Sequence, residues 1–312
     1  MPKPRGPLSE WVVAQIGTSD EPRGWAPYAG SLDDECLALW TLHELSYRGF
    51  EDASDDAEWH PAILATRHEL EVALEQRLRR RWPGAGAEVD DVPAALEALV
   101  ALDDAPSLAD HVRRSATADQ LLELLRQRSV YQLKEADPTT WVIPRLPTRP
   151  KAMLVELQYD EYGDGDPNRM HAHLFARGMR DVGLRPEYGA YVDDALPETL
   201  ELNNALTMFG LHRRLRGAAM GHLAAFEMTS SIPARKISQG LGRLGLDGEM
   251  AAYFDEHVEA DAIHEVLAVR GICGALAEDE PDQAAEILFG AFTCLGLEGR
   301  LASALLGSWD VA

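Results

Sequence analysis

Cysteine is scarce in this 312-residue chain: Cys36, Cys273 and Cys294 are the three present, and no two of them form a CxxC pair. An odd and sparse set argues against a disulfide framework and against a thiolate zinc site. The chain also lacks a run of 18 apolar residues and an apolar segment behind its N-terminus. We therefore expect neither a membrane span nor a secretory signal, and predict a reduced, cytoplasmic protein.

Basic residues are few relative to acidic ones. Lys and Arg number 29 against 52 Asp and Glu, which gives a formal net charge of -23. A nucleic-acid backbone would be repelled by such a chain, so no nucleic-acid partner is expected. The hydrophobic fraction of 46% nevertheless excludes a disordered acidic tail, and the length suffices for a substantial core.

Strand patterns are almost absent, and apolar residues recur at helical spacing between Gly and Pro breaks. We predict an N-terminal arm over residues 1–29, with at most one short helix around 10–16, and a single all-α domain over residues 30–312. Residues 138–150 are expected to be extended, and a helix is expected to restart after Asp166-Pro167. The other predicted helices are 31–49, 60–81, 92–101, 107–135, 152–162, 196–230, 247–270, 283–294 and 296–309.

The most informative segment is a helix that carries His257, Asp261 and His264. These residues are separated by four and three positions, so they share one helix face with the apolar residues Met250 and Phe254. Buried titratable groups are costly unless they are paired or bind a metal. Two imidazoles and a carboxylate on one face suit Fe, Mn or Zn. The alternative is a solvated polar face, for which the neighbouring glutamates are better candidates.

Further ligands are expected from other helices, as in carboxylate-bridged bundles. Glu44 occupies an apolar stripe, and Glu227 is flanked by Ala, Phe and Met. Glu161 and His171 flank a helix break. His173 lies two residues further on and therefore points about 200° away from His171, so only one of these two histidines can face a site. Taken singly, each of these acids and histidines is also compatible with a structural polar group.

Together, these motifs resemble the heme-oxygenase-like di-iron oxidase and oxygenase superfamily. The resemblance is carried by LHELSYRG at Glu44, DEYGDGDPNRMHAHLF at Glu161 and His171, and HVEADAIH at His257. The stretches LKEADPTTWVIPRL and LHRRLRGAAMGHLAAFEMTSS resemble a bacterial branch known as iron-containing redox enzymes. The resemblance implies a heme-oxygenase-like bundle of about seven core helices, here with extra N-terminal helices, that binds two irons rather than heme.

The resemblance also implies a ligand set. Several members carry a carboxylate three residues before the histidine of the second core helix, where this chain has Asn168. Glu227 would replace that carboxylate, or the second Fe(II) would be bound more loosely. The implied metal ligands are Glu44, Glu161, His171, Glu227, His257, Asp261 and His264.

The implied activity is O2-dependent oxidation of a small molecule, by N-oxygenation or by oxidative C–C cleavage, desaturation or decarboxylation. The expected cofactors are two Fe(II) ions per chain with O2 as co-substrate, and the expected partners are a small-molecule substrate and an electron donor, without membrane or nucleic acid. A homodimeric assembly is also compatible with the sequence. The alternatives are a heme-binding or a non-catalytic protein of the same fold.

Overall fold

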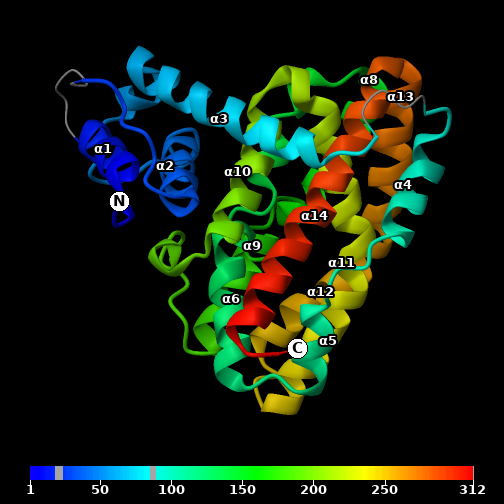
Figure 1. The fold of residues 1–312 in the computed structure, drawn as a ribbon. Coiled ribbons are helices and arrows are strands. Elements are labelled where there is room, and N and C mark those ends of the chain that lie inside the picture. Colours follow the sequence, from blue (N-terminus) through cyan, green and yellow to red (C-terminus); the bar gives the residue numbers. More distant parts are fainter. Residues whose placement is uncertain (18–23, 85–88, 312) are drawn as a thin grey trace.

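The computed structural model describes residues 1–17, 24–84 and 89–311, with the side chains of residues 259–262 outside the described part. All regular structure in this part is helical, which confirms the predicted all-α class (Figure 1). The α-helices are α1 (Pro7–Ile16), α2 (Leu32–Glu44), α3 (Pro61–Arg81), α4 (Val92–Ala101), α5 (Leu108–Arg114), α6 (Ala118–Gln132), α7 (Asp137–Thr140), α8 (Thr148–Glu161), α9 (His171–Asp181), α10 (Pro197–Leu211), α11 (Arg216–Leu244), α12 (Glu249–Val266), α13 (Ala275–Asp279) and α14 (Ala284–Ser308).

Helix α11 is the centre of the bundle and packs against α14, α12 and α5. It approaches α14 closely because both helices carry glycine where they meet. A β-carbon on Gly221 would collide with the carbonyl oxygen of Ile287, and one on Gly290 would collide with that of Ala218. The segment Pro281–Ser308 is long and apolar enough to cross a membrane, but 56% of its most apolar window is buried in the bundle, so it serves here as a core helix.

Helix α12 lies between α11 and α9, and a π-helical segment, Leu267–Gly274, continues it. Helix α8 packs against that segment, and α6 packs against α9 and α10. This arrangement brings α6, α8, α9, α11 and α12 around one buried region, in which the candidate ligands are found.

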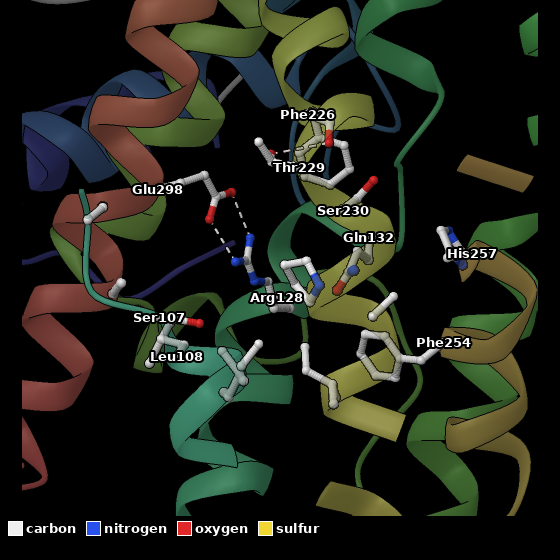
Figure 2. A pocket seen from close by; sticks show the side chains of 18 of the residues that line it. Ser107, Leu108, Arg128, Gln132, Phe226, Thr229, Ser230, Phe254, His257 and Glu298 are labelled. Atoms are coloured by element: carbon white, nitrogen blue, oxygen red, sulfur yellow. Dashed lines mark hydrogen bonds and ion pairs between the residues drawn. The ribbon is translucent and has the colours of Figure 1, made fainter. Parts of the chain in front are cut away.

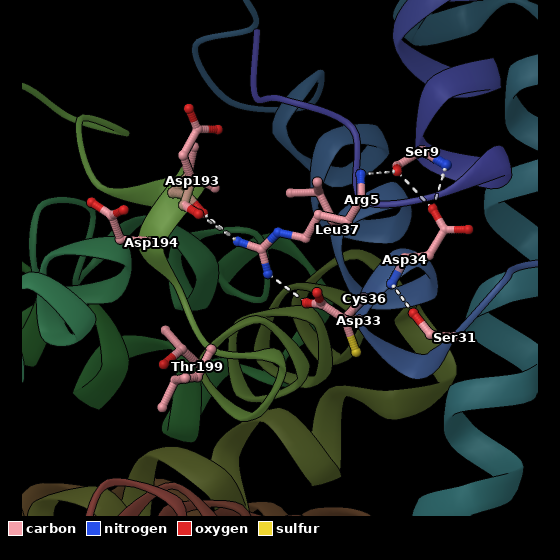
Figure 3. A network of polar contacts seen from close by, with 12 residues as sticks. Arg5, Ser9, Ser31, Asp33, Asp34, Cys36, Leu37, Asp193, Asp194 and Thr199 are labelled. Atoms are coloured by element: carbon pink, nitrogen blue, oxygen red, sulfur yellow. Dashed lines mark hydrogen bonds and ion pairs between the residues drawn. The ribbon is translucent and has the colours of Figure 1, made fainter. Parts of the chain in front are cut away.

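The N-terminal arm contains the short helix α1, which packs on α2 at one side of the bundle (Figure 1). Asp34 in the first turn of α2 fixes this contact. Its carboxylate accepts hydrogen bonds from the backbone N–H groups of Leu8 and Ser9, at 3.1 and 2.8 Å, and from the Ser9 hydroxyl at 2.6 Å (Figure 3). Arg5 pairs with Asp33 and donates to the carbonyl of Val192. The arm is therefore tied to α2 and to the segment before α10.

Residues 138–150 are not extended, contrary to the prediction. Pro138 lies in the first turn of α7, Pro144 in a 3-10 turn over Ile143–Arg145, and Pro150 in the first turn of α8. Proline has no N–H to donate, and the first turn of a helix does not need one. The same prolines that suggested an extended segment therefore begin helical turns.

The other differences concern helix breaks. The predicted helix over 107–135 is two helices, α5 and α6, and that over 196–230 breaks at His212–Leu215 and then runs through Pro233 to Leu244. The helix after the 160s loop begins at His171 rather than at Pro167, and the two predicted C-terminal helices are the single helix α14. Glycine inside a helix lowers its stability by only about 1 kcal/mol, so Gly296 does not end α14.

Candidate metal centre

One group of candidate ligands consists of Glu135, His171 and His257, all buried, with ligand atoms within 4.8 Å of one another. The His257 Nε2 lies 3.7 Å from a Glu135 carboxylate oxygen, and the rings of His171 and His257 are 4.6 Å apart. Donors on one transition-metal ion, each at about 2.1 Å, lie up to about 4.2 Å apart. Small shifts would therefore let these three side chains share an ion.

A second group consists of Glu161, Glu227 and His264, likewise buried and within 4.8 Å of one another. The His264 Nδ1 is 3.3 Å from a Glu161 oxygen and 3.6 Å from a Glu227 oxygen. Two carboxylates from α8 and α11 therefore converge on an imidazole from α12.

The two groups are adjacent because Glu161 and His171 meet. The His171 Nδ1 lies 3.0 Å from Glu161 Oε2, so one residue of each group contacts the other group. Glu161 is the last residue of α8 and His171 the first of α9, and the loop between them turns at Gly163 with a φ of 69°. A β-carbon there would strike the backbone of Arg169 and Met170. Glycine at 163 thus permits the tight connection that brings the two groups together.

Several buried atoms that could ligate a metal make no good hydrogen bond to one another. Glu161 Oε2, His171 Nδ1 and His264 Nδ1 are buried without a hydrogen bond of good geometry. On the outer side, His257 Nδ1 donates to the Tyr253 carbonyl at 2.8 Å, and His264 Nε2 lies 2.8 Å from the Asp160 carboxylate. Metal-bound histidines usually make such a bond through their other ring nitrogen. One ring nitrogen of His257 and one of His264 are therefore held by these outer contacts, and both histidines belong to the candidate metal groups.

In the metal-free site, neighbouring carboxylates raise the pKa values of His264 and His171. Burial alone would lower the pKa of His264, but the carboxylates of Glu227, Glu161 and Asp160 raise it to about 9. Burial also opposes protonation of His171, yet Glu161 raises its pKa above the ordinary value. Burial would raise the pKa of Glu161, but the histidines outweigh it and the pKa is lowered. Without metal, His264 is therefore protonated near pH 7 and pairs with the surrounding carboxylates.

Fe(II) binding near pH 7 should therefore release at least about one proton per chain, because metal ligation needs neutral imidazoles. Calorimetric titrations in buffers of different ionisation enthalpy should give different heats, and equal heats in all buffers would contradict the account. The same pKa shift stabilises the metal-free protein below pH 6.5, and this stabilisation is lost as the pH rises through about 9.

Glu44 lies outside both groups in this structure. Its carboxylate accepts from Lys134 Nζ at 3.2 Å and from the Tyr188 hydroxyl at 2.6 Å, and all three side chains lie largely inside the protein. Glu44 is buried, as its apolar stripe predicted, but its buried partner is an ammonium group. The residue that the sequence analysis missed is Glu135, although it lies in the LKEADP stretch that supported the family resemblance.

The remaining predicted residues have different positions. His173 is exposed whereas His171 is buried, as their angular separation predicts. Asn168 is exposed in the loop, where its amide donates to Asp166 at 3.0 Å, so it lies outside the site. Asp261 is in α12 one turn after His257, but its side chain is outside the described residues.

Replacing Glu227 by alanine should remove one donor of the second group only. We expect Glu227→Ala to keep one iron and lose the second, with a native far-ultraviolet spectrum, because Glu135, His171 and His257 remain. Arg235→Ala is the control, since Arg235 is exposed on the same helix. Iron counting beside a thermal melt decides: two irons in Glu227→Ala would exclude Glu227 as a ligand.

Comparison with known proteins agrees with this chemistry. Residues 122–299, more than half of the chain and including every member of both groups, match the family described as iron-containing redox enzymes. The chain is also similar to a nitrosourea synthase of Streptomyces achromogenes subsp. streptozoticus, with 30% identity over 123 residues. That match covers 39% of this chain and 26% of the synthase, so the chain spans about a quarter of its relative. With its helical bundle and its buried carboxylate–imidazole groups, the chain belongs to the iron-containing redox enzyme family and has the heme-oxygenase-like fold that this membership implies.

Proposed function

We propose that the protein is a non-heme, O2-dependent oxidase or oxygenase that holds two Fe(II) ions and acts on a small molecule. The observation that carries this proposal is the pair of adjacent ligand groups joined by the 3.0 Å contact between Glu161 and His171. A single axial histidine in an apolar pocket would suit heme. Three carboxylates beside three imidazoles suit hard, divalent iron instead.

The charges support two ions rather than one. Glu135, Glu161 and Glu227 supply three negative charges. Asp261, which the sequence places on the same face as His257 and His264, would supply the fourth. Two Fe(II) ions carry four positive charges, so the site would be close to neutral inside the protein, where an uncompensated charge is expensive. Bound Fe(II) would supply the electrons for reduction of O2, which protein side chains alone do not provide.

The chain supplies a largely apolar cavity next to the first ligand group. A cavity of about 240 Å³ reaches Glu135 and His257 and is lined by Phe226 and Phe254 (Figure 2). The Tyr253 hydroxyl donates to Glu135 at 3.0 Å, which holds that carboxylate in place. These residues would orient the ligands, exclude bulk water and position a substrate beside the metal site.

We propose nitrogen as the oxidised atom, because the relative's name refers to a nitrosourea and thus to a product oxidised at nitrogen. C–C cleavage and desaturation are the competing outcomes. The protein would act in a reducing cytoplasm, where the buried thiols of Cys36, Cys273 and Cys294 remain free, and would draw further electrons from an external donor.

Isotopically heavy O2 tests the reaction class. Fe(II)-loaded protein supplied with a reductant and a panel of primary amines should consume O2 only with its substrate. Mass spectrometry should then find one or more heavy oxygen atoms on the product's nitrogen. A product that has lost hydrogen or carbon without gaining heavy oxygen would contradict N-oxygenation and favour desaturation or cleavage. A Soret band in the purified protein would instead indicate heme.

A further inference from the structure

Two cavities of very different size lie beside the candidate ligands. The large cavity, of about 240 Å³, reaches Glu135 and His257 of the first ligand group but no member of the second group. The small cavity, of about 10 Å³, is lined by the same two residues and also by Glu161 and Glu227 of the second group. A cavity needs about 10–15 Å³ to hold one water molecule. The small cavity therefore has room for nothing larger than a water-sized molecule, and an organic ligand fits in the large one.

Three residues line both cavities. Two of them, Glu135 and His257, are candidate metal ligands, and the third is Phe226 of α11. Figure 2 shows Phe226, Phe254 and His257 among the side chains around the large cavity. Phe254 lines the large cavity but not the small one. Phe226 is therefore the one shared side chain that has no atom to bind a metal, and its ring lies between the two spaces.

The ring of Phe226 is held at this boundary by its neighbours. Phe226 precedes Glu227 in α11, and adjacent residues of a helix point about 100° apart, so the ring lies beside the carboxylate rather than behind it. The ring also packs edge-on against Tyr131, with centroids 5.4 Å apart and an angle of 75° between the ring planes. Aromatic pairs favour such edge contacts. Tyr131 lines the small cavity but not the large one, so this contact ties the ring to the small-cavity side.

The position of the ring makes the two ligand groups unequal toward a ligand. An organic molecule in the large cavity meets the metal centre where Glu135 and His257 face that cavity. The ring of Phe226 stands between such a molecule and the carboxylates of Glu161 and Glu227, which line the small cavity alone. Protein interiors are close-packed, so a molecule larger than the space behind the ring is excluded from it. The second group is thus open to a molecule about as small as water, such as O2.

We propose that Phe226 is a specificity-determining residue whose ring confines an organic substrate to the first ligand group and reserves the small cavity for a molecule of the size of O2. The proposal deepens the proposed function and rests on it for the identity of the small molecule. The barrier between the two cavities is itself a property of the metal-free protein, so it can be tested without iron.

Benzene is a suitable probe of the barrier, because apolar cavities of about 150 Å³ bind it. Leucine methyl groups show where it binds, since Leu124 and Leu295 line the large cavity alone, and Leu157 and Leu223 line the small cavity alone. In metal-free wild-type protein, nuclear Overhauser effects from benzene should reach the methyl groups of Leu124 and Leu295 but not those of Leu157 and Leu223. Phe226→Ala removes the barrier and should extend the effects to Leu157 and Leu223.

Phe254→Ala is the matched control, because it removes the same atoms from the wall of the large cavity without opening the small one. It should keep the wild-type pattern of effects. Both variants lose apolar contacts and should melt earlier than wild type, so the contrast between the two patterns carries the test rather than stability. The wild-type pattern tests the barrier even where a variant folds poorly. Benzene effects at Leu157 or Leu223 in wild type, no benzene in its large cavity, or equal patterns in the two variants would overturn the proposal.

The iron-loaded protein tests the consequence for a small ligand. Phe226→Ala should take up as much iron as wild type, since the ring is not a ligand, and a loss of iron would make Phe226 a support of the metal centre instead. Nitric oxide is similar in size to O2 and binds ferrous iron reversibly. Without O2, saturating benzene should weaken nitric oxide binding at least about tenfold in Phe226→Ala and leave it unchanged in wild type and Phe254→Ala. Equal weakening in all three proteins would contradict separate spaces for the two ligands.

The outcomes distinguish this proposal from the proposed function. Benzene confined to the large cavity of a protein that binds no iron would keep the barrier and reject the di-iron function. Benzene at Leu157 and Leu223 in a wild-type protein that takes up two irons and reacts with O2 would reject the barrier and leave the oxygenase function standing.

Discussion

His171→Ala should abolish O2 consumption by the iron-loaded protein, whereas His173→Ala should leave it unchanged. His171 belongs to the first ligand group and also contacts Glu161 of the second, so its loss affects both groups. Replacing residues that only support a ligand costs about 10- to 100-fold in affinity or activity, and we expect a larger loss for a ligand itself. Oxygen-electrode rates and iron content of the two variants measure the difference.

His173 is a matched control because it has the same side chain, lies in the same helical turn and faces solvent. Both variants should keep the helical spectrum of the wild type. A His173→Ala protein without activity beside an active His171→Ala protein would move the ligand by two positions and contradict the buried geometry described here.

Glu135→Gln should lose one of the two irons, whereas Glu44→Gln should keep both and lose stability instead. Glu135 is the carboxylate of the first ligand group, and an amide is a poor ligand for iron. Glu44 neutralises the buried ammonium of Lys134 at 3.2 Å. Removing one partner of a buried ion pair costs about 3–5 kcal/mol. Metal analysis and thermal melts of the two glutamine variants separate these roles.

This pair of variants decides whether Glu44, expected from the sequence, or Glu135, found beside the two histidines in the structure, is a metal ligand. An iron-deficient Glu44→Gln protein of normal stability, beside an iron-replete Glu135→Gln protein, would restore Glu44 to the ligand set. Lys134→Met in combination with Glu44→Gln provides a second check, because removing both charges should recover much of the lost stability while leaving iron uptake intact.

The candidate ligands on α12 could be predicted because one helix fixes their relative direction. His257 and His264 are seven residues apart, and helical geometry alone places them on one face. The structure shows both side chains buried at 7% and 1% exposure, each near carboxylates from other segments. The same angular argument allows only one of His171 and His173 to face the site; the family resemblance favours His171, and the observed burial agrees with that choice.

The choice between Glu44 and Glu135 could not be made from helical periodicity. Lys134 and Glu135 are adjacent in sequence and both buried, at 4% and 7% exposure, because the chain turns after α6 and passes between two polar sites. Periodicity describes which residues share a face of one helix, not which helices meet. Glu44 satisfied the pattern of a buried acid, and only the approach of Lys134 and Tyr188 shows what it binds.

The helix breaks have a similar explanation. The break at His212–Leu215 carries neither Gly nor Pro, and His212 contacts Glu71 of α3 at 2.8 Å. That contact is formed between distant segments and leaves no local signal. Conversely, Pro233 and Gly296 are recognisable helix breakers that the surrounding bundle overrides, because the tertiary packing of α11 and α14 outweighs their local cost.

An anaerobic titration with Fe(II), followed by rapid mixing with O2 under stopped-flow absorbance, tests the two-iron site most directly. The account predicts uptake of two Fe(II) ions per chain and then an absorbance change that needs both ions, that grows with iron loading and that is absent from His171→Ala. Saturation at one ion with full O2 reactivity, or reactivity without bound iron, would contradict the two-iron site formed by Glu135, Glu161, His171, Glu227, His257 and His264.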